Sequence, residues 1–302
     1  MNNKIIYIIC FVILILSCKE ETIIIGNNNA PNYSEIPTIL LENYVNRLYI
    51  DLIGREPLDS EMENDVQYLR DRNVTLGSRD SLIFTLQFDT AYIPGDSSYK
   101  FAYFHRIYDM VKVRLIEGAS NGDILFYMNN HYFDYEVDSV AGNLIDAQKH
   151  LIKYYRLYDL INSESEYYNG IINIKEIHKR MIYNSIYDEI NMNTFNFVNA
   201  AFDNLLFRYP TQNEFNNSYS MIEDKLPFII FGYSGSNKED FTNLICNSRE
   251  FYEGVVHWSY LTMLARTPTT IETDFLMNDF YITNDFQKLQ RFIMTTDEYA
   301  HF

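Results

Sequence analysis

Apolar residues recur at intervals of three and four from residue 38 onward, which is the spacing of one face of an α-helix. The same period places a second stripe along residues 101–115 and a third along residues 144–155. The pattern predicts an all-α chain of amphipathic helices, each with one apolar face. The residues that define the three stripes are Leu41, Tyr44, Val45, Leu48, Tyr49, Leu52 and Ile53; Phe101, Phe104, Tyr108, Val111 and Leu115; and Leu144, Leu151 and Tyr155, the last group interrupted by Gln148.

Three segments repeat at fixed spacing. In each, an Arg follows a Val by ten residues, a Pro follows the Arg by two, and a Glu follows the Pro by four. The residues are Arg55, Pro57 and Glu61; Arg208, Pro210 and Glu214; and Arg266, Pro268 and Glu272. Because the residue before a Pro is driven out of the helical region, the first helix must end there. The predicted unit is a helix, a tight Arg-x-Pro turn and a second helix.

The second helix of each unit needs a capping residue. Thr211 and Thr269 each precede a Glu by three residues, which is the spacing of a capping box. In the first copy Leu58 takes the place of the Thr, so we expect Asp59 or Ser60 to cap instead. The repeated Arg is interpreted as structural, bound to helix-terminal carbonyls and to the capping Glu, with a carboxylate or glycan contact as the alternative.

A second sequence pattern recurs at the end of each repeat, where an aliphatic residue precedes an aromatic residue by six positions. It occurs at Leu86–Tyr92, Ile245–Phe251 and Ile293–Tyr299. The chain after residue 37 therefore divides into four predicted segments. These are a first helical repeat at 38–100, a divergent helical segment without an Arg-x-Pro turn at 101–190, a second repeat at 191–254 and a third at 255–302.

Residues 44–57 read YVNRLYIDLIGREP and resemble the Leu-Gly-Arg-x-Pro signature of small helical domains. Such domains occur in bacterial surface proteins, in phycobilisome-linker-like proteins and in planctomycete cytochrome-associated proteins. The later copies keep the Arg and Pro but carry Phe207 and Ala265 where the first has Gly54. The resemblance implies an all-helical assembly or binding module. No haem-attachment CxxCH is present, so the cytochrome association does not carry over.

The N-terminus has the pattern of an export signal. Lys4 precedes an apolar run from Ile5 to Leu16, which is too short to span a bilayer of roughly 30 Å. The run ends in a motif that resembles a bacterial lipobox, so we expect a signal peptide at 1–17 and a lipidated Cys18. Residues 18–37 then form a turn-rich tether.

The three residues after Cys18 indicate a more specific cellular location. Lys19, Glu20 and Glu21 resemble the export signal of surface lipoproteins in the Bacteroidota. This resemblance implies a protein that is anchored to the outer membrane by its N-terminal lipid and faces the cell exterior.

The net charge bears on which partners the protein can bind, and the cysteine content bears on its chemistry. A formal net charge of −17 and a sequence pI of about 4.7 disfavour nucleic acid, which such a surface repels. Cys246 is the only thiol left after the signal and the lipidated Cys, and its apolar neighbours predict a buried, inert side chain. Aromatic residues make up 16% of the chain, which suits large helix contacts or an adhesive surface.

Candidate chemistry is sparse, and the sequence predicts no catalytic constellation, no cofactor and no metal. His131 with Asp134, Glu136 and Asp138 is the densest group of potential ligands and is interpreted as a solvated acidic loop. Residues 232–236 approach a nucleophile elbow but lack its final Gly, and are interpreted as a loop between helices.

The leading hypothesis is a non-enzymatic binding or assembly component that docks on a protein partner at the outer membrane through Tyr- and Phe-rich helix faces. The alternative is a glycan-binding lipoprotein that uses Trp258 or clustered Tyr as stacking platforms, although Trp258 is expected to be buried. A hydrolase that uses an unrecognised carboxylate pair is the third hypothesis.

Overall fold

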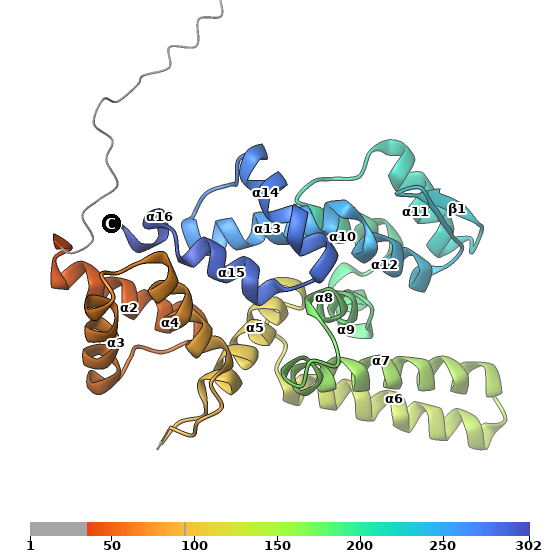
Figure 1. Cartoon of the computed structure of the whole chain (residues 1–302). Helices are drawn as coiled ribbons and strands as arrows, with labels where there is room; N and C mark the ends of the chain where they lie inside the picture. Colours follow the sequence, from red (N-terminus) through yellow and green to blue (C-terminus); the bar gives the residue numbers. More distant parts are fainter. Residues whose placement is uncertain (1–34, 94) are drawn as a thin grey trace, which may run out of the picture. The chain divides into compact units, whose positions relative to one another are not determined.

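The computed structural model describes residues 35–93 and 95–302. The predicted signal peptide, the lipidation site at Cys18, the export signal at Lys19, Glu20 and Glu21 and most of the tether lie outside the described residues. Ile36, at the end of the predicted tether, is already buried. Within the described part the all-α prediction is confirmed, because fifteen helices accompany a single two-stranded sheet (Figure 1).

Most of the helices are short, but α6 and α7 have 21 and 25 residues. In chain order they are α2 (Thr38–Leu52), α3 (Asp59–Asp71), α4 (Leu76–Phe88), α5 (Tyr99–Leu115), α6 (Asn121–Ala141), α7 (Leu144–Tyr168), α8 (Ile174–Ile182), α9 (Ser185–Asn191), α10 (Thr194–Leu206), α11 (Gln212–Glu223), α12 (Lys238–Asn247), α13 (Arg249–Leu264), α14 (Thr270–Thr283), α15 (Phe286–Met294) and α16 (Asp297–Ala300).

The Arg-x-Pro repeat is a three-helix unit rather than a pair of helices. The units are α2–α3–α4, α10–α11–α12 and α13–α14–α15, and in each the first helix packs on the second. Helix α13 contains residues on both sides of the expected boundary between residues 254 and 255, so that boundary falls within a continuous helix. The second unit ends with α12, and the third begins with α13.

The first and third units pack against each other. Helix α2 contacts α16, and α4 contacts α15. The Tyr44 hydroxyl donates to the Met294 carbonyl over 3.1 Å, and the Tyr299 hydroxyl donates to Asp51 over 2.7 Å. Each of these bonds links residues about 250 positions apart in the sequence. One apolar core thus runs through both ends of the described chain.

The expected capping of α3 is wrong. The helix begins at Asp59 behind Leu58, and neither Asp59 nor Ser60 occupies the capping position. The Glu61 carboxylate instead accepts the Leu58 N–H over 2.7 Å. One of the two hydrogen bonds of a capping box is therefore present although no capping hydroxyl is, because Glu61 accepts the free backbone N–H of Leu58.

Residues 232–236 lie in a β-hairpin, not in a plain loop between helices. Strands β1 (Phe228–Ile230) and β2 (Tyr233–Gly235) pair antiparallel, with Ile230 opposite Tyr233. The two connecting residues, Phe231 and Gly232, have φ of 52° and 82°. Positive φ at both positions is the requirement of a type I′ turn, which matches the twist of paired strands. No strand-to-helix nucleophile elbow forms here.

The aliphatic–aromatic pattern at the end of each repeat contains the start of a helix in two of its three copies. The hydroxyls of Ser248 and Thr296 accept the N–H groups of Phe251 and Tyr299 over 3.1 and 3.2 Å. The same hydroxyls donate to the carbonyls of Ile245 and Ile293. In the first copy no helix follows directly, and Tyr92 is exposed.

Candidate functional site

The repeated Arg holds two carboxylates. Arg208 binds both oxygens of Glu214 through its terminal nitrogens, over 2.9 and 2.7 Å. Its Nε donates to Glu250 over 2.7 Å. Hydrogen bonding to Arg208 lowers the pKa of Glu214 to about 2. Because Glu214 opens α11 and Glu250 lies in the first turn of α13, one guanidinium ties the Arg-x-Pro turn to two helix starts.

The other two copies repeat this geometry. Arg266 binds both oxygens of Glu272 over 3.0 and 2.6 Å, and Glu298 over 2.6 and 2.7 Å. Arg55 binds Glu61 over 2.7 and 2.8 Å, and its Nε donates to Asp96 over 2.6 Å. Each Arg also donates to the carbonyl of the residue that follows it, not to a helix-terminal carbonyl.

These bonds leave the three Arg side chains poorly suited to a ligand. A guanidinium has five N–H donors, and the carboxylates and the neighbouring carbonyl account for nearly all of them. The second carboxylate was missed at the sequence level. Glu250 and Glu298 each lie two residues after a capping hydroxyl, a shared spacing that marks the two Glu as equivalent but does not show that they reach the Arg.

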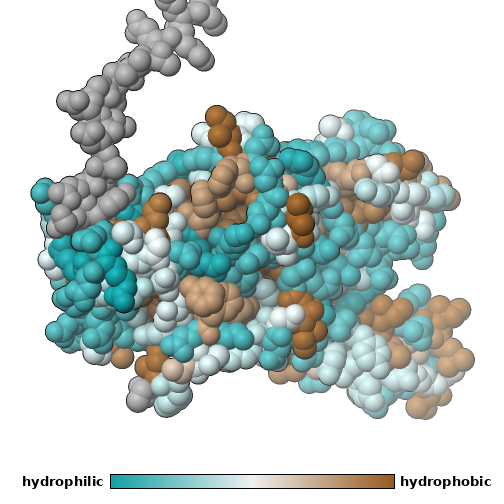
Figure 2. All heavy atoms as spheres, viewed as in Figure 1, coloured by the Kyte–Doolittle hydropathy of each residue, from teal (hydrophilic) through white to brown (hydrophobic). Residues whose placement is uncertain are grey.

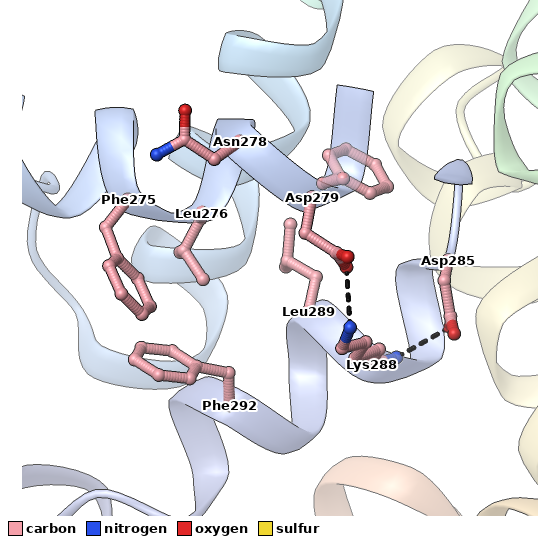
Figure 3. Close-up of a pocket in the computed structure, with 9 residues that line it drawn as sticks. Phe275, Leu276, Asn278, Asp279, Asp285, Lys288, Leu289 and Phe292 are labelled. Atoms are coloured by element: carbon pink, nitrogen blue, oxygen red, sulfur yellow. Dashed lines mark hydrogen bonds and ion pairs between the residues drawn. The ribbon is translucent and has the colours of Figure 1, made fainter. Parts of the chain in front are cut away.

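A hydrophobic cleft of about 320 Å³ lies between α14 and α15 (Figure 3). The rings of Phe275 and Phe292 face each other across its mouth, with centroids 4.9 Å apart. Its charged groups bind within the wall: Lys288 pairs with Asp279 over 3.0 Å, and Asp285 accepts the backbone N–H of Lys288. The cleft can therefore accept an apolar group but presents little to orient a polar substrate.

Helices α6 and α7 form a long antiparallel hairpin that carries the largest run of exposed apolar side chains (Figure 2). On α6, one helical stripe consists of Phe126, Phe133, Val137 and Val140, which we name the outer stripe. These side chains are between 50% and 91% exposed. Leu144 and Ile145, at the start of α7, are also exposed.

In the half of the hairpin near the α6–α7 turn, the polar and apolar faces are exchanged relative to a pair of amphipathic helices that pack through their apolar faces. Its inner face carries His131, Asp134 and Asp138 on α6 and His150 on α7. No residue from 129 to 146 is buried. Polar groups thus lie between the two helices beside the Tyr132–Tyr154 ring contact, while the outer stripe faces solvent. An exposed apolar stripe is the reverse of the pattern that burial favours.

One expectation about this hairpin is wrong, because residues 131–138 lie within α6 and do not form a loop. The apolar stripe at 144–155 lies on α7, and its two ends face solvent, since Leu144 is 70% and Tyr155 is 55% exposed. The helical period identifies a stripe but does not show whether another element covers it.

Two side chains with possible functional roles are buried as predicted. The Trp258 ring stacks on Phe286 with centroids 5.8 Å apart, so it offers no open platform for a sugar. The Cys246 thiol is buried, and burial raises its pKa well above the usual range. It therefore lacks the accessible thiolate of a nucleophile.

No protein family, curated protein or solved structure matches this chain. Among the described residues, no helix combines the length and the apolar character that crossing a membrane requires.

Proposed function

We propose that this protein is a non-enzymatic binding or assembly component, anchored to the outer membrane through a lipidated Cys18 and facing the cell exterior. The observation that supports it best is the outer stripe of the α6–α7 hairpin. Apolar surface of this extent on a helix is costly in water unless another surface covers it.

The partner that fits the outer stripe is a protein with an apolar groove. Phe126 and Phe133 are the anchors, because large aromatic side chains dominate the energetics of protein interfaces. Helix α6 carries four acidic residues, among them Glu136, and no Lys or Arg. A groove with a basic rim would complement them, and this charge pattern also disfavours docking on an anionic lipid surface.

Affinity isolation tests this proposal. Tagged full-length protein recovered from gently solubilised membranes should carry a stoichiometric protein partner. A Phe133→Ser/Val137→Ser variant should lose it. The matched control is Ile271→Ser/Ile282→Ser on α14, two side chains that are 82% and 78% exposed. Recovery of the protein alone, or equal capture by all three proteins, would contradict the proposal.

A glycan-binding role is the second candidate, and one specific feature favours it. A groove of about 330 Å³ beside α7 is lined by Tyr155 and Tyr183 together with Arg156, Asp159 and Arg180. Aromatic faces beside charged donors and acceptors are suited to stacking on and hydrogen bonding with sugars. A calorimetric screen of polysaccharides, with Tyr155→Ala as the variant, tests it; absence of heat from every glycan would exclude this role.

A further inference from the structure

The inner face of the α6–α7 hairpin brings two imidazoles and a carboxylate together. His131 and Asp134 are three residues apart on α6 and so share one face of that helix. His150 faces them from α7. One donor atom from each of the three side chains lies within 4.8 Å of the other two.

The Nε2 atom of each imidazole lies near a polar side chain, and only that of His131 is within hydrogen-bond distance. The Nε2 of His131 lies 3.0 Å from the Ser185 hydroxyl, and the Nε2 of His150 lies 3.7 Å from an oxygen of Asp138. The Nδ1 atoms of both rings are buried and have no hydrogen-bond partner. A buried polar atom without a partner is costly, so this arrangement calls for a ligand at Nδ1.

We propose that His131, Asp134 and His150 bind a divalent transition-metal ion, with Zn²⁺ as the best chemical match. Imidazole nitrogen and carboxylate oxygen are ligands that Zn²⁺ prefers, and two His with one carboxylate leave a coordination position for water. Polar groups beside the Nε2 atoms, such as those of Ser185 and Asp138, are typical of metal-bound His.

The distances suit a small ion. Bonds of about 2.0–2.2 Å place the ligand atoms of a tetrahedral Zn²⁺ about 3.4 Å apart. The Nδ1 of His150 lies 3.6 Å from an oxygen of Asp134, close to that value. The ligand atoms at most 4.8 Å apart come together by about 1.4 Å when they bind.

The ion would link α6 to α7 where the hairpin lacks a core. No residue from 129 to 146 is buried, so apolar packing there is limited to partly exposed contacts such as the Tyr132–Tyr154 ring pair, whose centroids are 5.3 Å apart. A metal bound between His131 and His150 supplies that link and fixes the helix that displays the outer stripe. The inference does not depend on the proposed function, because the site binds metal with or without a partner.

Metal titration of the chelator-treated full chain tests the site. Calorimetry should show one equivalent of Zn²⁺, and Co²⁺ should give the visible bands of nitrogen–oxygen coordination. His131→Asn, Asp134→Asn and His150→Asn should each weaken Zn²⁺ binding by more than about 100-fold, and Asp138→Asn by about 10–100-fold. Asp134→Asn changes no side-chain volume, so circular dichroism should find its helicity unchanged.

His105 provides the matched control. It also lies between two carboxylates, with Glu164 at 2.8 Å and Asp109 at 3.2 Å, but both of its nitrogens already have acidic partners. His105→Asn should leave Zn²⁺ affinity unchanged. The proposal is overturned if the wild-type chain shows no saturable binding. It is equally overturned if binding survives in the His131, Asp134 and His150 variants.

Discussion

The close crossing of α10 and α13 depends on Gly254, and the Gly254→Ala substitution, which adds one methyl group, tests this dependence. A Cβ at this position would lie 2.0 Å from the Leu205 carbonyl oxygen and 3.5 Å from the Leu206 Cα. Ordinary contact begins at 3.4 Å, so the helices must separate locally by about 1.4 Å. The obstructing atoms belong to the backbone and cannot rotate away.

The energetic cost follows from this geometry. Inserting a methyl group into a packed interior costs about 1–3 kcal/mol where side chains can adjust, and more where backbone must move. For Gly254→Ala we expect about 4 kcal/mol, just above that range, because the obstructing atoms belong to the Leu205 backbone. The higher helix propensity of Ala offsets about 1 kcal/mol of this destabilisation. The variant should therefore lose about 3 kcal/mol of unfolding free energy.

Urea unfolding followed by circular dichroism measures this loss. Gly77→Ala on α4 is the matched control, because a Cβ there meets no atom within 4 Å. The control should gain about 0.5–1 kcal/mol from reduced chain entropy. A Gly254→Ala variant as stable as the wild type would refute the close crossing of α10 and α13.

Three further predictions concern titratable groups. Arg208 holds the pKa of Glu214 near 2 instead of 4.5, so the stability this carboxylate contributes is present above pH 4.5 and is lost as the pH falls toward 2. Glu214→Gln should flatten urea-measured stability across that range, and identical pH profiles would contradict this. Burial raises the pKa of Asp65 from 3.8 to about 6, so stability is lost as the pH rises through that interval. Asp65→Asn should be more stable than the wild type at pH 7 by up to about 3 kcal/mol and equally stable near pH 3; equal stability at pH 7 would count against it. Cys246 should react with thiol reagents only in unfolding concentrations of urea, and labelling of the native chain would show that it is accessible.

Features that depend on neighbouring residues could be predicted from the sequence. The helical period predicted α2 and α5, and the three-residue spacing of Thr211 and Glu214 predicted the start of α11. The carboxylates beyond the capping Glu could not be placed in this way. Glu250 approaches Arg208 from a helix 42 residues later, and only the packed units bring the two together.

The candidate sites were harder to predict for the same physical reason. A period of 3.6 residues shows that a helix has an apolar stripe, but it does not show whether that stripe faces the core or a partner. On α6 the stripe faces solvent, and the polar stripe faces α7. His131 and His150 are 19 residues apart and meet only because the chain reverses at Gly142, which has a φ of 80°.

The proposed docking surface is the outer stripe of the hairpin. Site-specific photo-crosslinking in living cells, with a photoreactive phenylalanine in place of Phe133, shows whether a protein partner contacts it. The same probe at Phe275 on α14 is the control, since the two side chains are 64% and 58% exposed. Position 133 should give one discrete adduct with another protein, and position 275 should give none. Absence of an adduct at position 133, or the same adduct from both positions, would contradict this proposal.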